Sequence, residues 1–262
     1  MAPDDQNIEN SGPSAYVGVI PAAGLGSRLP DRELSKEMLP VGSSRRPVIG
    51  HLLDAMHVAG VDDIMVVMHE GKSDLFDYLA SPDWQHLCLR TRKTAGTSGV
   101  PESAALGLEN DQERNVAFGF PDILFEPGDA FTRLMEKLES ENADVVLGLF
   151  PTKKPAKSDM VDTDKAGNVI GIEIKPKETL LDLTWIIAVW KPAFTVFLAN
   201  LTQHDSDKLN GVVENASEDH LGQVFQLAIT NDMAVVSVAF EGGCSLDIGT
   251  PDDLVLAQSW AG

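Results

Sequence analysis

A short apolar segment at residues 16–20 leads directly into a glycine-rich stretch at residues 21–40, with the sequence PAAGLGSRLPDRELSKEMLP. A strand that runs at once into Gly24 and Gly26 favours a loop that wraps a polyphosphate, because glycines adopt conformations that side chains forbid and let amide groups approach phosphate oxygens. Neither standard motif is matched, since the dinucleotide pattern needs a third glycine and a P-loop needs Gly-Lys-Ser/Thr. Taken alone, the two glycines are equally compatible with a plain turn.

The charge distribution favours the phosphate-binding interpretation. The chain as a whole has a formal net charge of −20, which argues against a nucleic acid or an anionic membrane as its main partner. The segment from Arg28 to Arg46 has the opposite balance, with more basic than acidic residues. Arg28 and Lys36 would therefore supply the positive charge at the glycine-rich loop.

Composition and length indicate a globular protein. The 262 residues are 43% hydrophobic and 23% charged, enough for one large α/β domain with a substantial core. Cys88 and Cys244 form neither a zinc nor a disulfide pattern, so reduced thiols and a cytoplasmic location are expected. Residues 1–14 are polar and are expected to form a mobile tail before a single domain at residues 15–262. No apolar run approaches the roughly 18 residues of a membrane span.

Short apolar strands alternate with amphipathic helices along the rest of the chain, a pattern that predicts a mainly parallel, doubly wound sheet. A predicted turn at residues 165–168 connects two short strands into a hairpin. Pro47 marks a helix start and Gly60 its end, and Thr250 is expected to cap a helix opened by Pro251. Strands are expected at residues 16–20, 64–68, 87–89, 115–120, 144–150, 160–164, 169–174, 184–190 and 234–240, and further helices at residues 74–80, 102–108, 131–138, 192–201 and 218–229.

Two aspartates stand at predicted strand ends, where open α/β sheets bind their ligands. Asp122 follows the strand NVAFGF through Pro121, and Asp247 lies in the segment Leu-Asp-Ile-Gly-Thr. Two carboxylates that converge from separate strand ends can bind a hard divalent cation such as Mg²⁺. An aspartate after proline is also a common turn former, and one before a helix cap can be purely structural. A metal site therefore requires that the two side chains converge.

Two further segments are candidates for ligand contact. Lys175, in Ile-Lys-Pro-Lys, follows the predicted hairpin, although a lysine beside proline is often a solvated loop residue. Ser98 and Gly99 stand before a predicted helix N-terminus, which can face an anion or the edge of a base. Without other support that segment would be a turn.

Four segments in the same order resemble the sugar-1-phosphate nucleotidyltransferase family, which includes glucose-1-phosphate thymidylyl- and uridylyltransferases. The strongest is residues 22–41, where Ala-Ala-Gly-x-Gly-Ser-Arg-Leu precedes Ser-Lys-x-Met-Leu-Pro-Val, and the others are residues 120–122, 171–176 and 246–254. The resemblance spans nearly the whole chain after residue 14. It implies a single-domain, Rossmann-like, doubly wound mixed sheet of the nucleotide-diphospho-sugar transferase type, with a small β-rich sugar-binding insertion.

The resemblance also implies a role for each candidate residue. Arg28 and Lys36 would be the catalytic residues, with Lys36 and Lys175 on the sugar phosphate, and Asp122 and Asp247 would bind Mg²⁺. In the family reaction, a phosphate oxygen of the sugar 1-phosphate attacks the α-phosphorus of a nucleoside triphosphate, and pyrophosphate leaves. The expected nucleotide-binding residues are Ala22, Ala23, Gly24, Gly26, Ser27, Arg28, Ser98 and Gly99.

Several departures from the family pattern affect the expected substrates. The family motif is Glu-Lys-Pro, and its glutamate normally lies in the sugar pocket; Ile174 replaces that glutamate here. Pro121 replaces the usual glycine before the metal-binding aspartate. The loop from Arg28 to Lys36 is shorter than in the thymidylyltransferases, and residues 93–99 replace the glutamine-containing segment that reads the pyrimidine there. The base and the sugar therefore stay undetermined.

Together with the resemblance, the sequence thus predicts a cytoplasmic, Mg²⁺-dependent enzyme of nucleotide-sugar biosynthesis, and the resemblance implies that it uses dTTP or UTP and a sugar 1-phosphate. One alternative is transfer of a nucleotidyl group, such as cytidylyl, to a non-sugar phosphate. Another is a regulatory protein that binds a nucleotide sugar without turnover. Neither nucleic acid nor membrane is an expected partner, and a homo-oligomer is left open.

Overall fold

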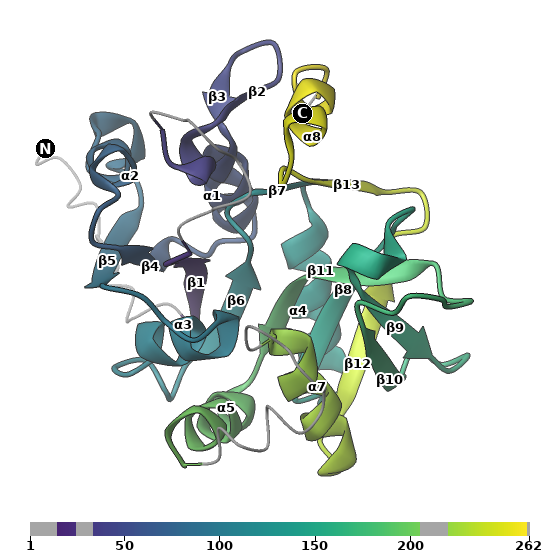
Figure 1. Cartoon of the computed structure of the whole chain (residues 1–262). Helices are drawn as coiled ribbons and strands as arrows, with labels where there is room; N and C mark the ends of the chain where they lie inside the picture. Colours follow the sequence, from purple (N-terminus) through teal and green to yellow (C-terminus); the bar gives the residue numbers. More distant parts are fainter. Residues whose placement is uncertain (1–14, 25–33, 205–219, 261–262) are drawn as a thin grey trace, which may run out of the picture.

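The computed structural model describes residues 15–24, 34–204 and 220–260, and Figure 1 shows their arrangement. The tail expected at residues 1–14 lies outside the described residues. So do Gly26, Ser27 and Arg28 of the glycine-rich loop.

A nine-stranded mixed sheet forms the centre of the molecule (Figure 1). Its long path has the order β12-β8-β11-β6-β1-β4-β5, and only β11 on that path runs against its neighbours. The hairpin of β9 and β10 joins the path through a bridge between Met160 and Thr184 of β11. The strands are β1 (Tyr16–Ala22), β4 (Asp63–His69), β5 (Cys88–Thr94), β6 (Asn115–Gly119), β8 (Val145–Pro151), β9 (Asp159–Thr163), β10 (Val169–Ile174), β11 (Leu183–Trp190) and β12 (Val235–Ala239).

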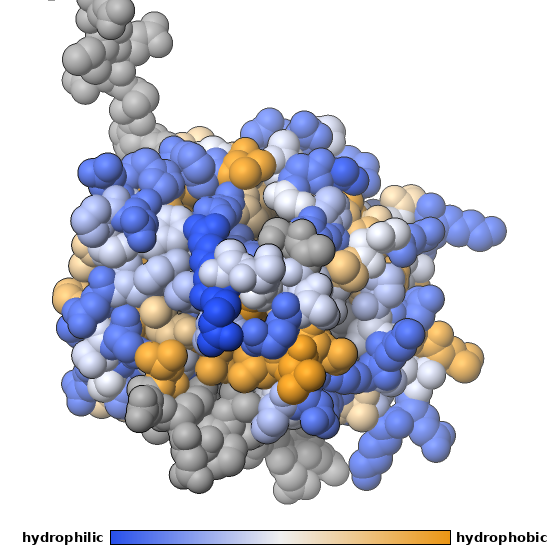
Figure 2. Space-filling model, turned by 90° about the horizontal axis from the view of Figure 1, so that it is seen from above, coloured by the Kyte–Doolittle hydropathy of each residue, from blue (hydrophilic) through white to orange (hydrophobic). Residues whose placement is uncertain are grey.

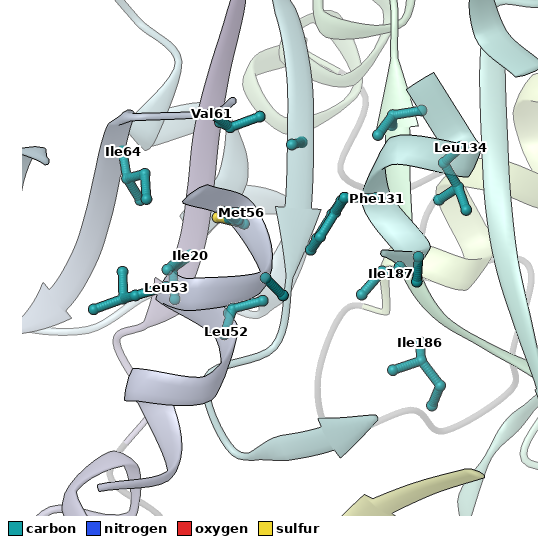
Figure 3. Close-up of a cluster of buried hydrophobic side chains, with 14 of the residues drawn as sticks. Ile20, Leu52, Leu53, Met56, Val61, Ile64, Phe131, Leu134, Ile186 and Ile187 are labelled. Carbon is teal, nitrogen blue, oxygen red and sulfur yellow. The ribbon is translucent and has the colours of Figure 1, made fainter. Parts of the chain in front are cut away.

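Helices cover both faces of this sheet, so the predicted doubly wound architecture is confirmed. One face packs on α1 (Val48–Val58), α2 (Ser73–Leu79) and α4 (Ala130–Ser140), and Figure 3 shows part of that core. The other face packs on α3 (Val100–Gly107), α5 (Pro192–His204) and α7 (Leu221–Thr230). Alternation along β1 explains the division, because Ile20 points into the first core and Val19 into the second.

Two small strand pairs lie outside the main sheet, and neither was predicted from the sequence. In one, β7 (Ile123–Glu126) pairs antiparallel with β13 (Cys244–Asp247). In the other, β2 (Pro40–Val41) pairs with β3 (Arg46–Pro47). A third apolar cluster, which includes Leu39, Leu124 and Ile248, packs these segments together with the helix α8 (Pro251–Ala257). The short 3₁₀ helices are η1 (Lys36–Met38), η2 (Pro82–Trp84) and η3 (Pro155–Lys157).

Local sequence signals placed several element ends correctly. Gly60 adopts a positive φ of 77° beyond the end of α1, and Thr250 accepts a hydrogen bond from the Asp253 amide as the cap of α8. β5 is longer than predicted, extending from Cys88 to Thr94 rather than over residues 87–89, because this edge strand is polar and half-exposed and so lacks an apolar run.

Figure 2 views the molecule from above Figure 1. Polar residues cover most of that face, and apolar residues form a band below its centre and a few separate patches. Within the described ranges, no helix is long and apolar enough to cross a bilayer.

Candidate functional site

Lys36, Asp122 and Asp247 converge beside the carboxyl ends of β1 and β6. The Lys36 Nζ lies 2.6 Å from Asp122 Oδ2 in a partly buried ion pair. Asp247 ends β13 and pairs across the strand with Ile123, next to Asp122, and the amide of Ile248 donates to the Asp122 carbonyl at 3.0 Å. The pairing of β7 with β13 thus brings the backbones of the two aspartates together, and both carboxylates act on the charge of Lys36.

The electrostatic surroundings keep Lys36 charged. Burial acts to lower the pKa of its ammonium group, but the nearby carboxylates of Asp122, Glu37 and Asp247 outweigh burial, and the net pKa is raised above its ordinary value. The charge of a partly desolvated group interacts more strongly with neighbouring charges than it would in water, because the local dielectric is lower.

Three anchors hold the 3₁₀ helix that carries Lys36, and the sequence analysis missed all of them. Asp74, at the start of α2, accepts hydrogen bonds from both the amide and the hydroxyl of Ser35, each at 2.6 Å. Glu37, which is fully buried, pairs with Lys72 at 2.7 Å, and Lys72 Nζ also donates to the Ala22 carbonyl at 2.8 Å. The side chain of Lys72 thus connects the end of β1 to the residue that follows Lys36.

Burial dominates the titration of this pair. It raises the pKa of Glu37 and lowers the pKa of Lys72, while the attraction between the two groups opposes both shifts. Nothing in the local sequence marks Lys72 as a buried cation, since it lies in a polar segment, His-Glu-Gly-Lys-Ser-Asp, between β4 and α2. Only the tertiary contact with Glu37 identifies it.

The described part of the glycine-rich loop emerges at the same edge of the sheet. Ala22 ends β1, Ala22 and Ala23 are buried, and Gly24 is exposed with open space where a side chain would be. The structure therefore brings the start of the loop close to Lys36, through the contact of Lys72 with Ala22.

Ser98 and Gly99 lie in the connection from β5 to α3, as the sequence predicts. The Ser98 amide donates to Glu102 Oε2 at 2.6 Å, and Gly99 has an extended backbone just before α3 begins. Because α3 packs against β1 and β4, its N-terminus stands at the carboxyl edge of those strands. The segment is thus placed at the same edge of the sheet as Lys36.

Lys175 lies apart from this group. It follows β10 with a positive φ of 44°, and its Nζ lies 3.3 Å from Nε2 of His220, the residue that caps α7. No hydrogen bond or ion pair among the described residues joins Lys175 to Lys36, Asp122 or Asp247. A substrate that contacts both lysines would have to reach from the carboxyl ends of β1 and β6 to the β9–β10 hairpin.

Comparison with known proteins places this chain in a family. The sequence profile of the nucleotidyl transferase family matches residues 17–260. A glucose-1-phosphate thymidylyltransferase from Neisseria gonorrhoeae is 24% identical over 93% of this chain and 81% of its own length. A UTP–glucose-1-phosphate uridylyltransferase from Bacillus subtilis is 42% identical over a shorter region, 34% of this chain and 30% of its own.

Solved structures share the same fold. The UTP-bound UGPase from Acinetobacter baumannii superimposes with a TM-score of 0.74 at 18% sequence identity, covering 92% of this chain and 91% of that one. The family profile matches far more than half of the chain, which confirms the resemblance seen in the sequence motifs. The chain therefore belongs to the nucleotidyl transferase family.

Proposed function

We propose that this protein transfers a nucleotidyl group from a nucleoside triphosphate, dTTP or UTP, to a sugar 1-phosphate, releasing pyrophosphate and forming a nucleotide sugar. The observation that carries the proposal is the convergence of Lys36, Asp122 and Asp247 from three separate segments beside the start of a glycine-rich loop. The names of the relatives that align with most of this chain support a sugar 1-phosphate as the acceptor.

The reaction needs no nucleophile from the protein. A phosphate oxygen of the acceptor attacks the α-phosphorus of the triphosphate, a new P–O bond forms, and the bond from the α-phosphorus to the bridging oxygen of the leaving pyrophosphate breaks. Lys36 stays protonated because the carboxylates around it raise its pKa, so it neutralises negative charge on the reacting phosphates. Arg28 is proposed to act in the same way from the loop. The remaining contribution is positioning of the two substrates.

Mg²⁺ is part of the proposal, and Asp122 and Asp247 would hold it. Carboxylate oxygens are the ligands Mg²⁺ prefers, and the two aspartates are adjacent through the pairing of β7 with β13. Within the described ranges no group of three or more His, Cys, Asp or Glu side chains could hold a metal ion. Mg²⁺ would complete its shell with water and substrate phosphates. The ion would add positive charge where the pyrophosphate departs.

Pyrophosphate release tests the proposal. The wild-type protein is incubated with Mg²⁺, each common nucleoside triphosphate, and a panel of sugar 1-phosphates and other phosphorylated alcohols. We expect release only when a sugar 1-phosphate and one pyrimidine triphosphate are both present. Release with non-sugar phosphates alone would favour the alternative acceptor, and binding of a nucleotide sugar without release in any combination would favour a regulatory protein.

A further inference from the structure

The C-terminal end of α8 is bound to the β2–β3 pair, which lies beside it in Figure 1. The Gly42 amide donates to the carbonyl of Ala257, the last residue of α8, at 2.9 Å. Just beyond the helix, Gln258 Nε2 donates to the Pro40 carbonyl of β2, also at 2.9 Å. Because β2 follows η1 directly, these contacts attach α8 to the segment that carries Lys36.

The N-terminal end of α8 is bound to a different element, the loop between β8 and β9. Lys154 of that loop forms an ion pair with Asp253, whose side chain is only 6% exposed. The same carboxylate accepts a hydrogen bond from Thr250 Oγ1 at 2.7 Å. Burial acts to raise the pKa of Asp253, but the hydrogen bonds from Lys154 and Thr250 and the nearby positive charge outweigh it, so the pKa is lowered. Asp253 is thus a buried, ionised anchor for the loop.

Hydrogen bonds continue from this ion pair to the backbone of Lys175. The Lys154 carbonyl accepts a hydrogen bond from Ser158 Oγ at 3.0 Å, and the Ser158 carbonyl accepts one from the Lys175 amide at 3.2 Å. At the other end of the path, Asp247 precedes the cap of α8 by three residues. The helix α8 is therefore connected, directly or through one loop, to three of the segments that the proposed reaction has to bring together.

We propose that the Asp253–Lys154 ion pair is a clasp that fixes the β8–β9 loop, and with it the Lys175 backbone, on α8. Asp253 and Lys154 are then positioning residues, because they act on the reaction through the segments that they join. Exposed ion pairs contribute little to stability, but the carboxylate of this pair is buried, so loss of Lys154 leaves a buried charge with one donor fewer.

The inference rests on the proposed function, in which a phosphate oxygen of one substrate has to reach the α-phosphorus of the other. Reacting atoms must be held about 3–3.5 Å apart, and a displacement of about 1 Å can lower the rate ~100-fold. A loop released from α8 would therefore lower the rate of the chemical step more than the affinity for either substrate alone.

Kinetics of single and double variants test the clasp. Lys154→Met removes the cation but keeps an unbranched side chain, and we expect kcat for pyrophosphate release to fall at least ~10-fold while the Kd for the nucleoside triphosphate is unchanged. Asp253→Asn can still accept the hydrogen bond from Thr250 and should lower kcat to a similar degree. The double variant should be no slower than the slower single variant, because both substitutions break the same contact.

A conservative variant and an amide-exchange measurement separate positioning from folding. Lys154→Arg keeps a cation with several donors on a half-exposed side chain and should regain most of the lost kcat. Hydrogen exchange of the amides at residues 152–158 reports on the clasp without turnover. It should be faster in Lys154→Met and in Asp253→Asn than in the wild type, and should return toward the wild-type rate in Lys154→Arg.

Lys153→Met is the matched control, because Lys153 is an exposed lysine of the same loop and its loss changes the charge by the same amount. It should leave kcat and the exchange rates at their wild-type values, and thermal unfolding shows that each variant is folded. A wild-type kcat in folded Lys154→Met, additive losses in the double variant, or no recovery in Lys154→Arg would overturn the inference and leave the proposed function in place. A wild-type protein that releases no pyrophosphate with any sugar 1-phosphate would overturn both.

Discussion

Lys36 is the residue on which the proposed chemistry depends most directly, because its ammonium group is held between carboxylates at the end of β1 and has a raised pKa. We expect Lys36→Ala to lower kcat/KM for pyrophosphate release by at least ~100-fold, the scale of losing one charge-stabilising group. Asp122→Ala should have an effect of similar size. Lys137→Ala is a matched control, since Lys137 pairs with Glu141 on the surface of α4. A near-normal rate in either site variant would remove that residue from the mechanism.

The raised pKa of Asp159 predicts that the unfolding free energy depends on pH. Burial in the folded protein raises this pKa from 3.8 to about 6, so folding favours the protonated carboxyl. The resulting contribution to the unfolding free energy is present below pH 3.8 and is lost as the pH rises through about 6. A pKa shift from 3.8 to about 6 corresponds to about 3 kcal/mol. Asp159→Asn cannot titrate at this position, so we expect its advantage in unfolding free energy over the wild type to grow between pH 4 and 6 and then level off.

Urea unfolding of the two proteins from pH 4 to pH 8 measures this difference. Lys175, which attracts the Asp159 carboxylate, is present in both proteins. A difference in stability that does not change over this range would show that the carboxylate is not desolvated.

The 3₁₀ helix at Lys36–Met38 is the element whose placement matters most, and the Glu37–Lys72 pair fixes it to β1 and α2. Removing one member leaves the other as an unpaired buried charge, so we expect Glu37→Met and Lys72→Met each to lower the unfolding free energy by about 3–5 kcal/mol. The double variant places two apolar side chains together and should recover much of that stability. The turnover of the double variant should stay low, because it lacks the contacts by which Lys72 joins Ala22 to the segment that carries Lys36.

Unfolding by urea and steady-state kinetics on the three variants measure the two effects separately. Arg90→Met is the matched control, because Arg90 pairs with Asp63 and Asp111 away from the site. It should lower stability while kcat/KM stays near the wild-type value. A double variant that recovers both stability and turnover would show that the pair contributes to stability alone.

At the scale of the whole molecule, the topology decides which distant segments form the site. Lys36 reaches the site from the loop after β1, Asp122 from the end of β6, and Asp247 from β13, near the end of the chain. The parallel alignment of β1 with β4 and β6 directs their carboxyl ends to one edge, and the pairing of β7 with β13 adds the last segment there. The family and the doubly wound fold were predictable because apolar periodicity and a set of ordered motifs both report on them.

The parts that could not be predicted are those with weak local signals. β7 and β13 are short, and no alternation distinguishes them from loops, although their pairing brings Asp247 to Asp122. In the sequence, Ile174 is recognisable only as a departure from the family pattern. Its cross-strand neighbour Asp159 could not be predicted, because neither segment alone specifies the register of the two strands.

The sequence by itself determined the order of strands and helices, the family, and the residue types available for phosphate chemistry, because periodicity, caps and contiguous motifs are local properties of the chain. Tertiary structure alone decided that Lys36 pairs with Asp122, that Lys72 joins Glu37 to the end of β1, and that Asp159 is enclosed beneath α7. Each of these depends on contacts between residues far apart in the chain. Burial and charge, which set their pKa values, exist only once those contacts form.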